Sequence, residues 1–203
     1  MYGGMDRESV PALKKADDDL IRGVTGAFGS REAASRAFSE RGFTLYRGGD
    51  AAEAMRRFNQ AWLLDPKNPD AFHGFGSVLH DREQMCEAQE MMERARALGL
   101  DHAGFLADLG RVSALCGVLL QRSGSATAPA RFEASEQAYT AALSAATDTS
   151  RAYVYASHAS ALYWRGRYSE AWDLVAAAEA EGAAMPDALL RMLTQKMPRP
   201  ATR

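Results

Sequence analysis

The sequence predicts an all-α protein built from stacked helical hairpins, and three observations carry this prediction. Gly42, Gly76 and Gly110 follow one another at intervals of 34 residues, and repeats of this length mark stacked supersecondary units. Apolar residues recur every three to four positions between the turn signals, as they do on one face of a helix. Alanine is plentiful, and it favours both helix formation and close helix packing.

The repeat extends to other positions of the unit. The matching sets are Phe38, Phe72 and Leu106; Ala54 and Ala88; Phe58 and Met92; and Ala61 and Ala95. A hairpin of two antiparallel helices cannot bury its apolar faces alone, so each hairpin must stack on the next. We expect Gly42, Gly76 and Ala159 where the two helices of a hairpin approach most closely, because a larger side chain would push the helices apart.

The residue pattern of the first unit resembles that of a known protein family. It reads Phe-x2-Arg-Gly-x2-Leu from Phe38 and Ala-x3-Phe-x2-Ala-x4-Pro from Ala54. This resembles the tetratricopeptide repeat (TPR), closely in the first two units and more loosely later. The resemblance implies a right-handed helical-hairpin solenoid that binds other proteins. The sequence of the first two units is also similar to bacterial TPR proteins of unassigned role, some of them exported.

The chain is expected to fall into the following segments. They are a disordered N-terminus (1–10), an N-terminal capping helix (11–29), four hairpins within 30–185 (about 31–68, 69–102, 103–148 and 150–182), a C-terminal capping helix (186–197) and a tail (198–203). Pro11 is tolerated in a first helical turn, and Gly29 supplies a helix stop. Asp65-Pro66 ends the second helix of the first hairpin, because the residue before a proline is pushed out of the helical region.

The third hairpin departs from the repeat. Its first helix is expected to continue through Leu120, and a loop rich in Ser, Gly, Thr and Pro follows over 123–130. Relative to the second hairpin, this is an insertion of about a dozen residues. Insertions in repeat proteins gather on one face, often a binding face. The alternative is a plain extension with a flexible loop.

Composition limits the class of partner. The net charge of −2 gives no reason to expect nucleic acid or an anionic membrane surface. No apolar run approaches the ~18 residues that a membrane span needs. Residues 1–10 lack a signal pattern, so the protein is expected to be cytoplasmic if Met1 is native and periplasmic if a signal segment was removed.

The two cysteines leave two interpretations open. Cys86 is expected near the start of one helix and Cys116 near the end of an antiparallel neighbour, so that both lie at one end of the stack. A disulfide between them would imply an oxidising compartment. The alternative is two separate thiols, since unpaired cysteine often behaves as a small apolar residue.

No catalytic motif stands out, and we expect neither an enzyme nor a cofactor or metal site. The sequence has no Gly-rich phosphate loop, Cys-x2-Cys or His-Glu-x2-His. His73 and His80 share a helix face but lie about 10 Å apart by helix rise, which is too far for joint ligation of one ion. His158 takes the place of a leucine in the repeat pattern, which favours a packed histidine over a ligand.

The TPR register, in contrast, predicts a partner-binding groove. In TPR arrays the first helices of the hairpins line the concave surface. The residues carried over to that surface are Phe43, Tyr46, Arg47, His73, His80, Arg111, Tyr153, Tyr163 and Trp164. Exposed aromatics and arginine often anchor a bound peptide or helix, and Arg47 and Arg111 are candidate charge anchors. The alternative for each residue is packing against a neighbouring unit.

The TPR positions that hold a carboxylate clamp in chaperone-binding members carry Ser39, Phe43, Asp70 and Gly74 here, so that clamp is absent. The sequence therefore predicts a non-enzymatic scaffold or adaptor that binds a protein or peptide in the groove, as a monomer or weak homodimer. The second hypothesis is a self-associating structural subunit that uses the extension and loop of the third hairpin as its contact.

Overall fold

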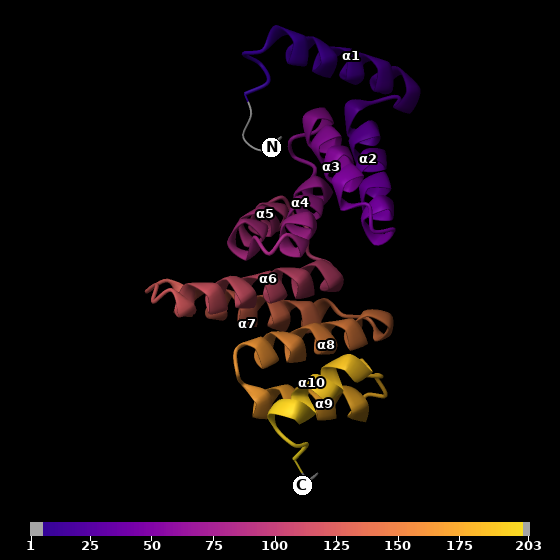
Figure 1. The fold of residues 1–203 in the computed structure, drawn as a ribbon. Coiled ribbons are helices and arrows are strands. Elements are labelled where there is room, and N and C mark those ends of the chain that lie inside the picture. The colour runs from indigo at the N-terminus through magenta and orange to yellow at the C-terminus, as the bar shows by residue number, and fades with distance from the viewer. Residues whose placement is uncertain (1–5, 201–203) are drawn as a thin grey trace. The chain divides into compact units, whose positions relative to one another are not determined.

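The computed structural model describes residues 6–200, and its regular structure is helical throughout that range (Figure 1). The helices are α1 (Pro11–Phe28), α2 (Arg31–Arg47), α3 (Ala51–Leu64), α4 (Pro69–Asp81), α5 (Met85–Ala97), α6 (Ala103–Arg122), α7 (Ala128–Ala145), α8 (Asp148–Trp164), α9 (Tyr168–Ala180) and α10 (Asp187–Lys196). The predicted all-α class built from helical hairpins is confirmed. The first part of the predicted disordered N-terminus, 1–5, and the end of the predicted tail, 201–203, lie outside the described residues.

The chain forms two compact units, residues 1–100 with α1–α5 and residues 101–203 with α6–α10. In the first unit, α2 pairs with α3 and α4 with α5, and α3 packs on α4. The turn from α2 to α3 follows from its residues. Gly49 adopts a φ of 85°, which favours glycine, and the Asp50 carboxylate accepts a hydrogen bond from the Glu53 N–H at 3.0 Å, which caps α3.

A single ring fills the centre of the first unit. Phe58 is completely buried, and it occupies the space that two glycines leave open. A Cβ atom added to Gly42 would lie 2.6 Å from the Phe58 ring, and one added to Gly74 would lie 2.3 Å from it. Phe58 therefore packs against both α2 and α4, so the glycines set how closely these helices approach α3.

Buried polar groups fix the junction between the two hairpins of this unit. The Asn68 amide donates hydrogen bonds to the hydroxyls of Ser35 at 2.7 Å and Ser39 at 3.1 Å. Its oxygen accepts a bond from the Asp70 N–H and so caps α4. Ser35 in turn donates to the Ala61 carbonyl at 2.7 Å. These bonds leave the buried polar atoms satisfied and specify one orientation of α4 on the first hairpin.

The second unit repeats the arrangement with an aromatic from α7. α6, α7 and α8 lie side by side, and α6 and α8 run in the same direction (Figure 1). Tyr139 is completely buried, and a Cβ added to Gly110 would lie 2.8 Å from its ring. Further along the same hairpin, Gly117 approaches Phe132 in the same way.

Because α7 begins at Ala128, with Pro129 in its first turn, the connection after α6 is shorter than the loop predicted over 123–130.

The end of the second unit is closed by α10, which packs on α8 and α9. Leu189 and Leu193 of α10 join the core cluster that surrounds Trp172 of α9. The Trp172 indole N–H donates a hydrogen bond to the Met197 carbonyl at 3.1 Å, which fastens the chain just after α10. The last hairpin thus has its apolar face covered within the unit.

Within the described range, α6 is the one helix long and apolar enough to cross a membrane, with a mean hydropathy of 1.6. However, 67% of that stretch is buried inside the structure. Buried core helices pass the same test of length and hydropathy, so the finding is weak evidence for a membrane span. The absence of a membrane span stays a prediction.

Replacing Gly42 with alanine is expected to lower the free energy of unfolding by about 1–3 kcal/mol, because the new Cβ overlaps the Phe58 ring. Gly23 in α1 is the matched control, since a Cβ there meets nothing within 4 Å. Gly23→Ala should stabilise the protein by up to about 1 kcal/mol through helix propensity. Urea unfolding followed by circular dichroism measures both variants. Equal stabilisation by the two would contradict the close approach of α2 and α3.

Candidate functional site

The predicted groove residues of the first unit are mostly engaged in packing. Phe43 lies edge-on to the buried Phe58 and close to the His73 ring, with ring centroids 5.0 Å away in both cases. His73 is itself buried. The Tyr46 hydroxyl donates to the backbone carbonyl of Ser77 at 3.4 Å. These contacts tie α2 to α4.

The two remaining groove residues of the first unit lie at helix ends. Arg47 is exposed in the last turn of α2. His80 lies in the last turn of α4, where its ring Nδ1 is 3.1 Å from the Asp81 carboxylate. Neither Arg47 nor His80 belongs to a polar cluster of the kind described next for the second unit.

The second unit brings together a polar triangle that the sequence only partly predicted. The Tyr153 hydroxyl of α8 donates a short hydrogen bond to the Asp108 carboxylate of α6. Arg111, one turn along α6, donates to Asp108 at 2.8 Å and to the Tyr153 hydroxyl at 3.3 Å. Arg111 and Tyr153 were predicted from the TPR register, and Asp108 lies one turn before Arg111 on the same helix.

Burial and charge explain the protonation of this triangle. Burial, reinforced by the negative charge of Asp108, raises the pKa of Tyr153 to about 12. Burial is the largest single influence on Arg111 and would lower its pKa, but the charge of Asp108 and the smaller contributions of Tyr153 and Tyr139 together outweigh it, so the pKa is raised. The phenol therefore stays protonated and the guanidinium stays charged at neutral pH. The triangle is an arrangement in which the Tyr153 hydroxyl and one terminal nitrogen of Arg111 donate to the Asp108 carboxylate, while Arg111 Nε has no hydrogen-bond partner.

Tyr153 belongs to a larger surface of exposed and half-buried side chains. Tyr153 and Trp164 are eleven residues apart on α8 and so share one side of the helix, about 16 Å apart along its axis. They are 42% and 49% exposed. On α6, Asp108, Arg111, Leu115 and Leu119 are spaced to share one side, and Leu119 is exposed. We call the surface formed by Asp108, Arg111, Leu115, Leu119, Tyr153 and Trp164 the α6/α8 face.

Tyr163 supports Trp164 from the side. The two rings meet edge to face with centroids 5.4 Å apart, and Tyr163 also lies 5.6 Å from the ring of Tyr168 in α9. Tyr163 is partly buried against the core of the last hairpin. Of the predicted pair, Trp164 therefore offers the accessible ring and Tyr163 holds it in place.

An ionic cluster joins α7 to the end of α8. The Glu136 carboxylate binds His158 at 3.1 Å, Arg167 at 2.7 Å, and Arg165 through a short hydrogen bond. The Arg165 guanidinium also covers the Phe132 ring at 4.4 Å. Burial would raise the pKa of Glu136, but the hydrogen bond from Arg165 and the interactions with His158, Arg165 and Arg167 together outweigh it and hold that pKa below its usual range.

His158 is a packed residue rather than a ligand. Its ring stacks on Tyr139 with centroids 4.1 Å apart and an interplanar angle of 11°. Burial is the main influence on this side chain and lowers the pKa of His158, although Glu136 opposes the shift. The neutral ring thus contributes to packing near neutral pH.

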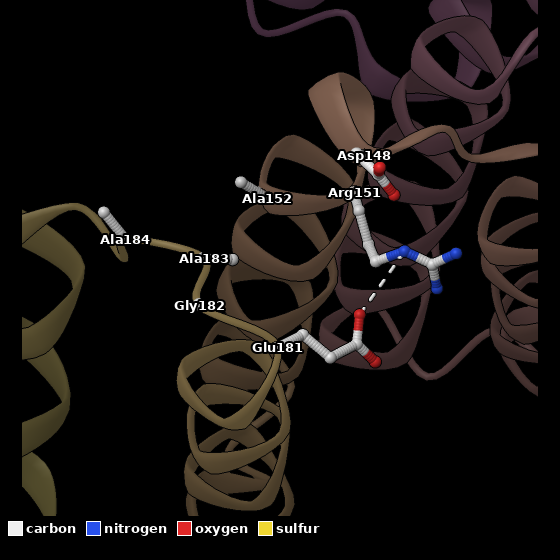
Figure 2. A pocket seen from close by; sticks show the side chains of 7 residues that line it. All are labelled: Asp148, Arg151, Ala152, Glu181, Gly182, Ala183 and Ala184. Carbon is white, nitrogen blue, oxygen red and sulfur yellow. Dashed lines mark ion pairs between the residues drawn. The ribbon is translucent and has the colours of Figure 1, made fainter.

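The second unit also has an open hollow at the start of α8, with a volume of about 680 Å³. Figure 2 shows that its lining combines small residues with the facing side chains of Arg151 and Glu181. Arg151 Nε lies 3.3 Å from the Glu181 carboxylate, which also accepts a bond from the Tyr155 hydroxyl at 2.7 Å. Its lining carries no aromatic anchor, so we place the candidate site on the α6/α8 face instead.

Within residues 6–200, no group of three or more His, Cys, Asp or Glu side chains is arranged to hold a metal ion. Cys86 lies in the first turn of α5, and Cys116 is buried in α6. Pairing of the two cysteines stays a prediction of the sequence.

No protein-family model matches the chain, and no curated protein matches it. Among solved structures, the chain is similar to YrrB, a TPR protein with an unusual peptide-binding site. The two are 17% identical over 79% of this chain and 85% of that chain, with a TM-score of 0.37. The helical hairpins described above are those that the TPR resemblance of the sequence implies.

Glu136→Gln is expected to lower the free energy of unfolding by about 1–2 kcal/mol, because two arginines and His158 lose a carboxylate partner. The effect stays below that of a fully buried pair, since the side chain is 38% exposed and water screens it. Glu133→Gln, one turn earlier and exposed, is the matched control and should change stability by less than about 0.5 kcal/mol. Similar losses in both variants, measured by urea unfolding, would argue against the cluster.

The predicted disulfide has a direct test. If Cys86 and Cys116 are bonded, the denatured and unreduced protein takes up no iodoacetamide, and reduction exposes two reactive thiols. Mass spectrometry of the intact chain counts the adducts, and a peptide digest identifies the linked pair. Two adducts without reductant would establish the alternative of separate thiols.

Proposed function

We propose that this protein is a non-enzymatic protein-interaction module that binds a peptide or a partner helix on the α6/α8 face. The observation that carries the proposal is the exposure of Tyr153 and Trp164, 42% and 49%, on one side of one helix. Large aromatic side chains left in water are the residues that most often dominate binding energy at protein interfaces. An aromatic pair on one rigid helix offers two anchors at a fixed distance.

Both anchors are held before any partner arrives. Tyr153 is tied to Asp108 and Arg111 by hydrogen bonds, and Trp164 rests against the edge of Tyr163. A side chain that is already ordered loses little rotamer entropy on binding, so more of the contact energy appears as affinity. The arrangement is that of a preorganised binding surface.

The first-unit residues of the predicted groove enter the proposal less directly. Phe43, Tyr46 and His73 make packing contacts within that unit, and only Arg47 is exposed. We therefore assign the principal anchors to the second unit and keep a contribution of the first unit as a prediction.

One observation favours the second candidate function, self-association through the extension of the third hairpin. Leu119 lies near the end of α6 and is 44% exposed. An exposed leucine near the end of a long helix offers an apolar contact to another copy of the chain. Static light scattering separates the candidates, because the binding module predicts a monomer or weak dimer and the structural subunit predicts a stable oligomer.

The proposal is tested by selecting ligands from a library of random linear peptides of about 16 residues, long enough for a helix of about 24 Å. Peptides selected on the wild-type protein are titrated against Tyr153→Ala/Trp164→Ala. Loss of two aromatic anchors is expected to weaken binding by about a hundredfold or more. Phe28→Ala is the control, since Phe28 is an exposed aromatic of α1, in the other unit.

Peptides that bind the double variant as tightly as the wild type would place the site elsewhere. Urea unfolding of the double variant confirms that the fold is kept, which is expected because both side chains are largely exposed.

A further inference from the structure

We propose that α9 carries a further peptide-binding site, around Trp172 and Glu179, for an extended segment that bears an arginine. Residues 197–199, which we call the strap, occupy this site within the same chain. The proposal goes beyond the proposed function, because the site lies on α9 and shares no residue with the α6/α8 face. It is drawn from the contacts by which α9 holds the strap.

The strap lies on α9 as a bound peptide would. The Trp172 indole N–H donates a hydrogen bond to the Met197 carbonyl at 3.1 Å. The Arg199 guanidinium covers the same indole, 5.5 Å from the ring centroid, which is the geometry of a cation–π contact. Both terminal nitrogens of Arg199 donate to the Glu179 carboxylate, one of them at 3.1 Å. The site therefore binds one backbone carbonyl and, two residues later, one arginine side chain.

The helix holds both binding groups in place. Trp172 is 4% exposed and belongs to the core cluster that includes Leu189 and Leu193 of α10. Glu179 lies seven residues after Trp172, about two helical turns along the same side of α9. The spacing between the indole and the carboxylate is therefore set by α9 itself.

The sequence of the strap explains its extended shape. Met197 and Arg199 each precede a proline, Pro198 and Pro200, and the residue before a proline is driven into the extended region. Met197 accordingly has a φ of −151° and a ψ of 123°. A segment that is already extended loses little conformational freedom on binding. The ligand class is therefore an extended segment in which an arginine lies between prolines.

The strap is held loosely enough to leave the site. The side chains of Arg199 and Glu179 are 45% and 39% exposed, and an ion pair in contact with water contributes little to stability. When the strap leaves, the Trp172 indole N–H and the Glu179 carboxylate are open to another segment of the same chemistry. The short connection to α10 gives the strap an effective concentration in the millimolar range, so it competes with any such ligand.

The first measurement follows the indole proton of Trp172 by NMR in the full chain, with its signal assigned from triple-resonance spectra. Arg199→Ala removes the ion pair and the cation–π contact, so exchange of this proton with water is expected to become about five- to tenfold faster. Arg191→Ala, at an exposed arginine of α10, is the matched control and should leave the rate unchanged. Equal exchange rates in Arg199→Ala and the wild type would overturn the strap.

The second measurement titrates a synthetic peptide with the sequence of residues 195–200 to about 5 mM, a level comparable with the effective concentration of a tethered segment. The shift of the Trp172 indole signal reports binding. The peptide is expected to bind Arg199→Ala about fivefold or more tightly than the wild type, because the weakened strap competes less. Adding Glu179→Gln to that variant, or replacing the arginine of the peptide with alanine, is expected to weaken binding about fivefold.

Two results would overturn the binding site. One is a peptide that leaves the Trp172 signal of Arg199→Ala unmoved throughout the titration. The other is binding that is unaffected by Glu179→Gln, because the peptide would then lie elsewhere on the protein. Neither result bears on the α6/α8 face, whose ligands are selected independently of the strap peptide.

Discussion

The structure depends on how closely paired helices approach, and in each unit this distance is set by a glycine facing an aromatic ring. Phe58 fills the space beside Gly42 and Gly74 in the first unit, and Tyr139 fills the space beside Gly110 in the second. Close packing of this kind gains dispersion energy over the whole ring and tolerates no added methyl group. The helix axes and the positions of outward-facing side chains follow from it.

The candidate site is a consequence of this packing. The Tyr139 hydroxyl lies 3.0 Å from both the backbone oxygen and the hydroxyl of Ser157, and the Ser157 hydroxyl donates to the Ala107 carbonyl at 3.3 Å. These bonds fasten α8 to α6 and α7 through buried groups. They fix the register in which Tyr153 meets Asp108, so an exposed aromatic is positioned by a buried one.

Much of the fold was predictable from the sequence, because its signals are local. The 34-residue period, the glycines of the turns and the proline after Asp65 each restrict the backbone near their own position. The class of the protein and its hairpins followed from these residues. Gly74 was missed as a packing glycine, since its partner Phe58 lies on a different hairpin and only the stacking of α3 on α4 brings the two together.

By itself, the sequence determined that the chain forms helical hairpins and which residues lie on the first helix of each. Only the tertiary structure decided what those residues do. It buried His73, engaged Tyr46 with Ser77, and left Tyr153 and Trp164 in water. The physical reason is that exposure and hydrogen bonding depend on which helix packs alongside, and helical periodicity specifies a face without specifying its neighbour.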